Sequence, residues 1–566
     1  MKRWIRYSLI GTCLLGLLGF GITRWLRAPL QVLTRSGLPQ LEEIQVYMNQ
    51  NQAATFTEPY RDQTRTGDDL EQIIVDRIQA AQSTVDVAVQ ELRSPRIAQA
   101  LRDRHIAGVK VRLVLENTYS QPLSQITAGE IAQLNDRQRH RYQENLLLLD
   151  RDRNGQVSSD EAVNNDALLV IQDAGIPWLD DTADESVGSG LMHHKFVVLD
   201  RQTVIATSAN FTPSDLHGDL STPTSRGNAN SLLVIDNVPL AQLFTQEFNL
   251  LWGDGPGGQA DSLFGVNKPF RPAQKVIIGD ATVWVQFSPS SSTVPWAASS
   301  NGLIARMLSQ ANAQIDLALF VFSEQPLADV LEQQHNEGVE IRALIDPQFA
   351  YQNYSEALDL LGVALSRRNA PCTAEANNRP WSEPIPGVGV PQLPEGDLLH
   401  HKYGVVDQTL VIIGSHNWSA AANQRNDETL LAIDHPTIAA HYQREFDRLY
   451  ANSYLGIPNF LQEKLDTQDQ ECSTLTTPTQ TSSPSPLLST QSTSSPEVAS
   501  PEGTAPVNLN TATQTELEHL PGIGPKLAER IIIARQAKPF TSLADLDQVP
   551  GIGPKLLEEL TNQVTW

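Results

Sequence analysis

The sequence predicts an α/β protein in which one arrangement of strands and helices occurs twice along the chain. Short apolar stretches with strand character alternate with helical stretches such as 68–82 and 325–336. This order is typical of sheets that are covered by helices. Three strands of the first half have counterparts of similar pattern in the second half: 44–48 with 283–287, 85–89 with 315–319, and 108–112 with 338–342.

Length and charge limit the classes of protein to consider. The chain has 566 residues, too many for one hydrophobic core, so we expect about two to four domains. The formal net charge is −24. Such a charge argues against a broad basic surface for nucleic acids and favours solubility. Any positive field that binds phosphate must therefore be local to one cleft.

The N-terminal segment has the composition of a membrane anchor. Residues 7–22 are apolar, and basic residues flank this run on both sides. Trp4 and Trp25 lie where interfacial tryptophans are found at the ends of a span. A cleaved signal peptide is the alternative, but no small-x-small cleavage site follows the run. We therefore expect residues 1–30 to form a transmembrane signal anchor, with the rest of the protein outside the cytoplasm, in the periplasm or at the cell surface.

The most informative pattern is a His-x-Lys motif that occurs twice, each time followed by an aspartate and then by Ser-x-Asn. The intervals are the same in both copies, and apolar residues fill them, as in a buried strand. Because residues i and i+2 of a strand share a face, the histidine and lysine of each copy should point the same way, while His194 and His401 point the opposite way. The first copy consists of His193, Lys195, Asp200, Ser208 and Asn210, and the second of His400, Lys402, Asp407, Ser415 and Asn417.

These residue types suit the chemistry of phosphate esters. Histidine can attack phosphorus or protonate a leaving group near neutral pH. Lysine supplies a positive charge for phosphate oxygens, and the side chains of Ser-x-Asn supply neutral donors. A single His-x-Lys would carry little weight, whereas two copies with the same downstream pattern argue against coincidence.

The paired motifs are the HKD signature, and over residues 43–455 the chain resembles the phospholipase D superfamily, whose members cleave phosphodiesters in lipids or nucleic acids. The resemblance implies a two-lobed α/β fold, a duplicated mixed sheet covered by helices, with half 1 at 43–255 and half 2 at 275–455. It also implies that both motifs meet in one cleft, so we expect a monomer. One departure is Thr207, which stands where the second copy has the family's usual Gly414. The first half is therefore expected to hold phosphate less closely.

The resemblance further implies a two-step reaction. One histidine attacks phosphorus, the other protonates the leaving oxygen, and water then hydrolyses the phosphohistidine. No metal is required, because the two lysines supply the positive charge. By analogy His193 is the nucleophile and His400 the general acid, although the residues alone allow the reverse assignment. Asp200 and Asp407 are expected to buttress the motifs.

A second asymmetry follows the motifs. Glu428 occupies a position where family members commonly have a carboxylate that orients a catalytic histidine, and the first half has Asn230 there. An amide stabilises an imidazolium less than a carboxylate does, so the two histidines should differ in pKa. The residues expected to bind substrate are Ser208, Asn210, Ser415, Asn417 and Glu428.

The first half contains an insertion before its His-x-Lys motif, and residues 150–161 within it match the EF-hand calcium loop. Oxygen-bearing side chains stand at the ligand positions of the loop, Gly155 stands at its sharp turn, and one backbone carbonyl completes the set. The alternative is an acidic, solvated loop between two helices. We expect a structural or regulatory Ca2+ that does not contact the reacting phosphate. The expected ligands are Asp150, Asp152, Asn154, Gln156, Ser158 and Glu161.

The cysteines outside the anchor are Cys372 and Cys472. In an exported protein they would either pair, and so tie the second half to the segment that follows it, or remain two free thiols; the sequence leaves both open. Residues 470–505 are rich in Ser, Thr and Pro and nearly free of charge. This composition predicts a disordered linker.

Residues 507–566 form a tail with its own duplication. The sequence Pro-Gly-Ile-Gly-Pro-Lys-Leu occurs twice, each time where one expected helix meets the next. The tail resembles tandem helix-hairpin-helix domains of the bacterial competence DNA-receptor type, which implies DNA binding through backbone N–H groups. Five Lys and Arg against seven Asp and Glu make the tail slightly acidic, so a protein-contact or spacer domain is the alternative. The expected DNA contacts are Gly522, Gly524, Lys526, Gly551, Gly553 and Lys555.

Two functions compete on these observations. The first is a membrane-anchored, extracytoplasmic nuclease that uses the tail to hold DNA. The second is a phospholipase D that hydrolyses membrane phospholipids to phosphatidic acid, which the anchor favours. A non-catalytic DNA-uptake or adhesion protein is a third hypothesis, against which the two intact His-x-Lys pairs argue.

Overall fold

The structure is a computed structural model of the chain. It describes residues 36–186, 190–366, 372–374 and 378–476, and in the tail 507–512, 525–537 and several single positions. The chain divides into two compact units, 1–478 and 479–566, and the second unit has a hydrophobic core of its own.

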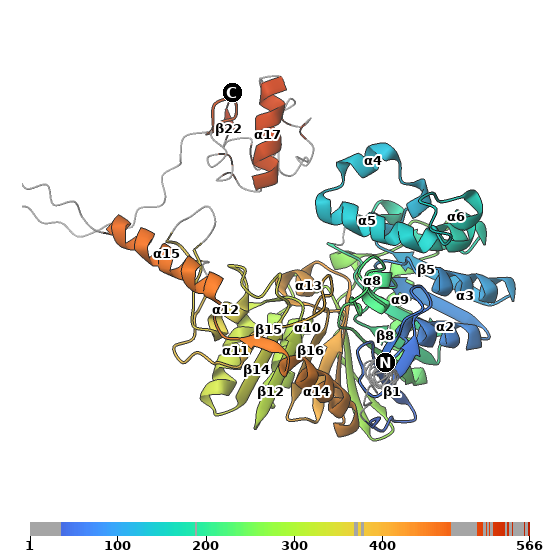
Figure 1. Ribbon diagram of the computed structural model, residues 1–566, viewed down its shortest axis with the longest axis horizontal. Helices are drawn as coiled ribbons and strands as arrows, with labels where there is room; N and C mark the ends of the chain where they lie inside the picture. The colour runs from blue at the N-terminus through green and yellow to red at the C-terminus, as the bar shows by residue number, and fades with distance from the viewer. Residues whose placement is uncertain are drawn as a thin grey trace, which may run out of the picture. The chain divides into compact units, whose positions relative to one another are not determined.

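The first lobe is built on a mixed sheet of seven strands (Figure 1). In spatial order these are β1 (Ile44–Met48), β9 (Ser231–Asp236), β8 (Thr203–Thr207), β7 (Lys195–Leu199), β4 (Thr84–Val89), β5 (Lys110–Leu115) and β6 (Trp178–Asp180). β4, β5 and β6 run parallel, and the other neighbours are antiparallel. The central strands are apolar runs buried on both faces, as expected for a sheet with helices on both sides.

Helices cover the outer face of this sheet. Asp69 and Ser94 accept backbone N–H groups at the start of the first two helices, and Pro95 occupies the first turn, where its missing N–H costs no hydrogen bond. Their apolar residues share one core with the sheet. The helices are α2 (Leu70–Ala80), α3 (Pro95–Ile106) and α7 (Ala167–Asp173); β2 (Thr55–Thr57) and β3 (Thr64–Thr66) form a separate hairpin.

The second lobe repeats this plan on a nine-stranded sheet. In spatial order the strands are β10 (Gln274–Ile278), β11 (Ala281–Ser288), β19 (Glu428–Asp434), β17 (Leu410–Gly414), β16 (Lys402–Val406), β12 (Gln314–Leu319), β14 (Glu340–Ile345), β15 (Val388–Pro391) and β20 (Ser453–Leu455). The outer core includes α10 (Ser300–Leu308), α11 (Gln325–Asn336) and α12 (Glu356–Leu360). The short strands β13 (Phe322–Ser323) and β18 (Trp418–Ser419) pair separately, and α13 (Ala420–Gln424) follows them.

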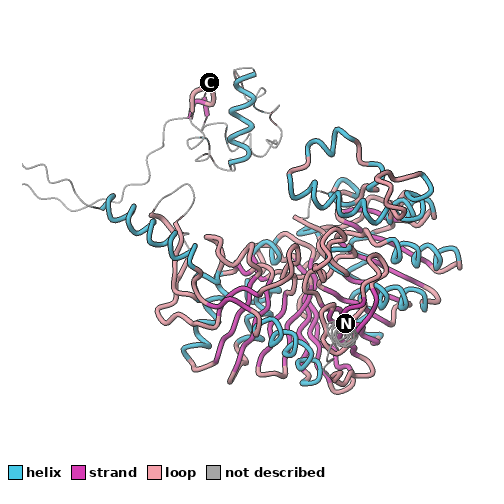
Figure 2. The backbone as a smooth tube through the Cα atoms, viewed as in Figure 1, coloured by secondary structure: helices cyan, strands magenta, loops and turns pink. Residues whose placement is uncertain are grey.

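Two long helices join the lobes. α9 (Val238–Trp252) packs on β4, β7 and β8, and α14 (Pro436–Tyr450) packs on β1 and on four strands of the second sheet. One core contains residues of both helices and both sheets, so the described residues between 36 and 476 form a layered structure in which sheets alternate with helices (Figure 2). The two-lobed α/β fold expected from the sequence is therefore confirmed.

The insertion of the first lobe lies between β5 and β7 and forms a group of helices. Capping boxes begin three of them, at Thr127, Asn135 and Ser158, so that each start is fixed by its own sequence. The helices are η1 (Asn117–Tyr119), η2 (Leu123–Gln125), α4 (Ala128–Gln133), α5 (Asp136–Leu149) and α6 (Ser159–Asn165); η3 (Ala183–Glu185) precedes the motif. Figure 1 shows α4, α5 and α6 together at one end of the first lobe.

A disulfide closes the second lobe. Cys372 pairs with Cys472, with their Cα atoms 5.5 Å apart, and Cys472 lies on α15 (Asn459–Thr476). The sequence allowed either a disulfide or two free thiols, and the structure has the disulfide. α15 also continues past residue 470, where the linker was expected to begin.

The predicted anchor 1–30 and the rest of the predicted linker lie outside the described residues. Within the part of the chain that the structure describes, no helix has both the length and the apolar character that crossing a bilayer requires. In the tail, α17 (Pro525–Ala537) contributes to a core with Leu509, Leu546 and Leu560, and β21 (Val507–Asn508) pairs in parallel with β22 (Val564–Thr565).

Candidate active site

The two predicted histidines line one cavity between the lobes. The cavity has a volume of about 390 Å3, and both His193 and His400 border it. Each histidine lies two residues before the start of a strand, because β7 begins at Lys195 and β16 at Lys402. The expected meeting of both motifs in a single cleft is what the fold produces.

Each histidine is held from the opposite lobe. Nδ1 of His193 lies 2.7 Å from Oε2 of Glu428, and the backbone N–H of His193 donates to the carbonyl of Asp427. Nδ1 of His400 lies 3.0 Å from Oδ1 of Asn230. Glu428 and Asn230 are fully buried at the starts of β19 and β9. Because each histidine is held by a residue of the other lobe, neither lobe alone can form the site.

The Nδ1 contacts determine what the other ring nitrogen can do. An Nδ1–H that donates to Glu428 or to Asn230 leaves Nε2 as the nitrogen that faces the reaction. Burial and the nearby lysines lower the pKa of His193 and of His400 well below the usual value. A neutral imidazole with Nδ1 held and Nε2 free is the form that can attack phosphorus.

Glu428 was expected to orient a catalytic histidine and also to bind substrate, and its contacts agree with the first role and not with the second. Glu428 is fully buried and accepts hydrogen bonds from the hydroxyl of Ser415 at 2.7 Å and from Asn426. Burial raises the pKa of its carboxyl group. Glu428 does not border the cavity, and one of its carboxylate oxygens contacts the imidazole of His193.

Ser208 and Ser415 were also expected to donate to phosphate, but their hydroxyl groups are engaged elsewhere. Ser208 donates to Oδ1 of Asn230 at 2.8 Å and accepts from the backbone of Ser231. Ser415 makes the equivalent pair of bonds with Glu428 and the backbone of Thr429. Both serines therefore fix the groups that hold the histidines.

Asn210 and Asn417 have the surroundings expected of substrate-binding groups. Each is only partly buried, and the side-chain carbonyl oxygen of each has no hydrogen-bond partner among the described residues. Asn210 also borders the cavity. Because a phosphate oxygen accepts hydrogen bonds, the side-chain NH2 group of each asparagine, and not its buried carbonyl oxygen, is the group that could donate to a ligand.

The two motif lysines are buried and crowd positive charge beside the histidines. Nζ of Lys195 donates to the carbonyl of His193 at 3.0 Å, and Nζ of Lys402 donates to that of His400 at 2.7 Å. Burial lowers the pKa of Lys195 to about 8. Burial and the charge of Lys195 lower the pKa of Lys402 to about 7. An anion bound here would offset both the burial of the lysine charges and the repulsion between them.

The aspartates of the motifs do not reach the cavity. Asp200 accepts backbone N–H groups of Gln82, Ser83 and Thr84. Asp407 accepts those of residues 312–314 in the same way. Both aspartates therefore join the turn after the motif strand to the start of the neighbouring strand, which holds the motif in register.

The neighbouring histidines belong to buried ion networks. Nε2 of His194 lies 3.3 Å from Glu247, which also pairs with Lys268. Nε2 of His401 lies 3.2 Å from Glu445. His194 and His401 are fully buried and point away from the cavity, in agreement with the alternation expected of a strand.

Thr207 does not alter the backbone that follows it. The Ser208 N–H bonds to Ser231 at 3.1 Å, as the Ser415 N–H bonds to Thr429 at 3.1 Å. The Thr207 hydroxyl donates to the carbonyl of Ser231 at 2.7 Å. The expected loosening of the first copy has no counterpart in these contacts.

The insertion contributes a wall of the cavity, which the sequence did not indicate. His140, Arg141, Glu144 and Asn145 of α5 all border it. The Arg141 guanidinium forms a salt bridge with the buried Glu91, and Glu144 accepts hydrogen bonds from Ser221. No motif announces such a role, because it depends on how the helix packs on the lobe.

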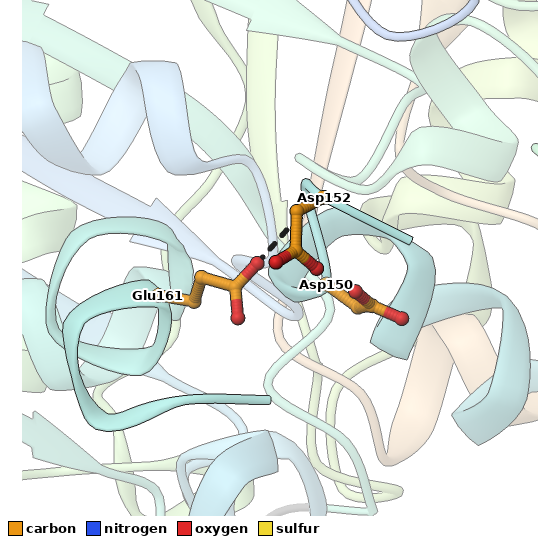
Figure 3. Close-up of side chains that lie close together, drawn as sticks. All are labelled: Asp150, Asp152 and Glu161. Carbon is orange, nitrogen blue, oxygen red and sulfur yellow. Dashed lines mark hydrogen bonds between the residues drawn. The ribbon is translucent and has the colours of Figure 1, made fainter. Parts of the chain in front are cut away.

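The predicted calcium loop connects α5 to α6 (Figure 3). Carboxylate oxygens of Asp150, Asp152 and Glu161 lie within 4.8 Å of one another. Asp150 accepts the backbone N–H groups of Asn154 and Gly155 at 3.0 and 2.8 Å, and Gly155 has a φ of 82°, which glycine adopts without strain. The Ser158 hydroxyl and the amide of Asn154 face the same turn through their own hydrogen bonds. The donor set of the loop fits Ca2+.

The predicted DNA contacts are largely beyond what the structure describes. Gly522, Gly524, Gly551, Gly553 and Lys555 lie outside the described residues, and Lys526 lies on α17 without a described side chain. Their roles remain predictions.

Comparison with known proteins supplies the family. The family model described as cardiolipin synthase, PLD-like domain matches residues 74–252 and 304–450, and a helix-hairpin-helix motif matches 503–565. The mitochondrial cardiolipin hydrolase of Xenopus tropicalis is 29% identical over 174 residues, which are 31% of this chain and 72% of that protein. The Xenopus laevis protein of the same name is 31% identical over 154 residues, 27% of this chain and 62% of that protein.

Among solved structures, phosphatidylserine synthase from Haemophilus influenzae Rd KW20 aligns with a TM-score of 0.43 and 12% identity, covering 77% of this chain and 95% of its own. The two segments matched by the first family model span more than half of the chain and contain both His-x-Lys motifs. The chain therefore belongs to the PLD-like domain family that is described under cardiolipin synthase.

Proposed function

We propose that the chain is a phosphodiester hydrolase that works through a phosphohistidine intermediate. The observation that carries this proposal is the placement of His193 and His400 on one cavity, each with Nδ1 held from the opposite lobe. Nε2 of His193 attacks phosphorus, and His400 donates a proton to the leaving oxygen. Water then attacks the phosphohistidine, with His400 as the base, and His193 is released. Lys195 and Lys402 stabilise the charge on the phosphoryl oxygens.

For the substrate we propose nucleic acid, cleaved outside the cytoplasm by a protein anchored through residues 1–30. The helix-hairpin-helix motif at 503–565 supports a DNA tether. The disulfide between Cys372 and Cys472 supports an oxidising compartment. Hydrolysis of a membrane phospholipid is the second candidate, favoured by the family description and by the names of the curated relatives.

We also propose that the loop 150–161 binds Ca2+ through Asp150, Asp152, Asn154, Ser158, Glu161 and the carbonyl of Gln156. The support is the clustering of three carboxylates between α5 and α6. The ion would supply a fixed charge that joins the two helices. Because α5 borders the cavity, the ion would stabilise one wall of the site without touching the reacting phosphate.

The full-length protein in detergent provides the test. It would be assayed with and without EDTA on single-stranded DNA and on vesicles of phosphatidylcholine and of cardiolipin. Cleavage of DNA that persists in EDTA supports the nuclease, and release of phosphatidic acid supports the lipid hydrolase. His193→Ala and His400→Ala should each abolish the activity, and His441→Ala, a histidine on α14 that bonds to Pro39, should leave it intact. Activity at the wild-type level in either motif variant would overturn the assignment.

The tail has a separate test. Deletion of residues 507–566 should leave cleavage of short oligonucleotides unchanged and weaken cleavage of long DNA, because a tether raises the local concentration of substrate. An equal loss on short and long substrates would contradict the tether.

A further inference from the structure

The two catalytic histidines have unequal partners. Nδ1 of His193 faces a carboxylate, Glu428, at 2.7 Å, whereas Nδ1 of His400 faces the neutral amide of Asn230 at 3.0 Å. A histidine that must hold a proton as general acid gains more from a negative neighbour than from a neutral one. By these direct contacts, the proposed acid has the weaker partner.

A second carboxylate lies behind Asn230. Asp215 belongs to the short helix α8 (Pro213–Leu216), and only 3% of its surface is exposed. Its Oδ1 lies 3.6 Å from Nδ1 of His400. Asp215 also borders the cavity, so its charge acts in the space where the reaction takes place. A buried charge at this distance is only weakly screened by solvent.

Asp215 also determines how the amide of Asn230 is oriented. Nδ2 of Asn230 donates to Oδ1 of Asp215 at 3.2 Å, and the hydroxyl of Ser208 donates to Oδ1 of Asn230 at 2.8 Å. Both contacts place the amide oxygen, and not the amide nitrogen, toward His400. Reversal of the amide would set its N–H groups against Ser208 and against the imidazole N–H.

No lysine or arginine among the described residues forms an ion pair with Asp215 within 4 Å, although its charge also acts on Lys195 and Lys402 from farther away. The remaining hydrogen bonds of Asp215 come from neutral donors, the backbone N–H of Asn210 at 2.8 Å and the side-chain amide of Asn228 at 2.6 Å. The carboxylate is thus held in place by neutral groups, and in the described ranges the ionisable side chain that pairs with it within 4 Å is His400.

We propose that Asp215 is the positioning residue that supplies the second histidine with its carboxylate, acting through Asn230 and across the short distance to Nδ1 of His400. The assignment rests on the proposed phosphodiesterase function. In this arrangement Asp215 opposes the effect of burial and of the two lysines on His400, and so favours the protonated form that the leaving oxygen requires. The orientation of Asn230 fixes the ring. In the first lobe Asp215 and Asn230 together hold and charge-stabilise His400, as Glu428 of the second lobe does for His193.

The test compares two phosphodiester substrates in Asp215→Asn. One substrate releases p-nitrophenolate, which departs without a proton, and the other releases an alkoxide, which needs one. Loss of a general acid's partner should slow the alkoxide substrate by at least about tenfold and the p-nitrophenyl substrate much less. The alkaline limb of the kcat/KM profile should move to lower pH, because loss of the negative charge lowers the pKa of His400.

Two further variants separate this role from a structural one. Asp68→Asn neutralises a carboxylate of the same lobe that bonds to the backbone of Met48, so it should reduce stability and leave the alkaline limb in place. Asp215→Asn combined with Asn230→Asp returns a carboxylate to Nδ1 of His400 and should restore the alkaline limb.

An equal loss on both substrates with unshifted limbs would overturn the proposal. If the wild-type protein cleaves no phosphodiester, the proposed function fails instead. An NMR titration of the His400 imidazole then tests the role of Asp215 by itself. The pKa of His400 should be lower in Asp215→Asn than in the wild type, and an equal pKa would contradict the proposal.

Discussion

Glu428→Gln is the sharpest test of the proposed nucleophile. The substitution keeps the size and the acceptor oxygen of the side chain but removes the charge that lies 2.7 Å from Nδ1 of His193. Glu428 is fully buried, so water cannot replace what is lost. A hydrogen bond to a charged group contributes about 1.5–3 kcal/mol, which corresponds to a decrease in kcat of roughly 10- to 150-fold.

The pH profile shows whether the loss acts on the nucleophile. Without the carboxylate, the imidazolium form of His193 is less stable and its pKa falls further. The neutral, attacking form then persists to lower pH, so the acidic limb of kcat/KM should move to lower pH while the alkaline limb stays in place. KM should change little, because Glu428 does not face the cavity.

The matched control is Glu445→Gln, which removes the carboxylate beside the adjacent His401 at 3.2 Å. That pair is buried and faces away from the cavity, so the variant should lower the unfolding temperature and leave kcat and both limbs as in the wild type. Wild-type kcat in Glu428→Gln, or a loss that the control matches at equal stability, would refute the reasoning. A shift of the alkaline limb instead would exchange the roles of the two histidines.

Three further predictions follow from the site and its surroundings. Orthovanadate should raise the unfolding temperature more at about pH 6 than at about pH 9, because the charges of Lys195 and Lys402, with pKa values lowered to about 8 and about 7, are lost as the pH rises through those values; equal shifts would contradict this. Millimolar Ca2+ should raise the unfolding temperature of the wild type but not of Asp150→Ala or Glu161→Ala, whereas Asp160→Asn, an exposed carboxylate of the same loop outside the ligand set, should respond as the wild type does. Cys372→Ser should lower the free energy of unfolding in urea by about 2–5 kcal/mol, and a reductant should then have no further effect; an equal urea midpoint for the oxidised wild type and the variant would contradict a structural disulfide.

The repeated strands were predictable because their signal is local. The strand Val85 to Val89 is apolar apart from one aspartate and is buried, and its copy at 315–319 has the same pattern and pairs in the same way. The histidine-lysine motif was predictable for a similar reason. Its residue types and the alternation of its side chains between the two faces of a strand both depend on a few consecutive residues.

The crossing of partners between lobes was not predictable. His193 and Glu428 are separated by 235 residues, and their contact depends on how two sheets pack against each other. The role of Asp215 is still harder to infer, because its helix has only four residues and no periodic pattern. The wall formed by α5 has the same origin, since an insertion read alone says nothing of the surface on which it packs.

The two copies of the motif differ in two ways, one that concerns the backbone and one that concerns charge. Gly414 has a φ of 149°, and a Cβ there would lie 2.1 Å from the carbonyl oxygen of Thr429, so the second copy requires glycine. Thr207 has no such constraint, and its hydroxyl bonds to Ser231 at 2.7 Å, so this exchange preserves the backbone around the serine that follows.

The exchange of Glu428 for Asn230 is different, because it changes the charge beside a histidine. A direct carboxylate at 2.7 Å suits a nucleophile, whose reactivity rises with the basicity of its ring. A carboxylate at 3.6 Å behind an amide suits an acid, which must hold a proton and then release it. The copy that departs further from the motif is therefore the one that tunes its partner for proton transfer, and the division of labour between the histidines follows from this difference in charge.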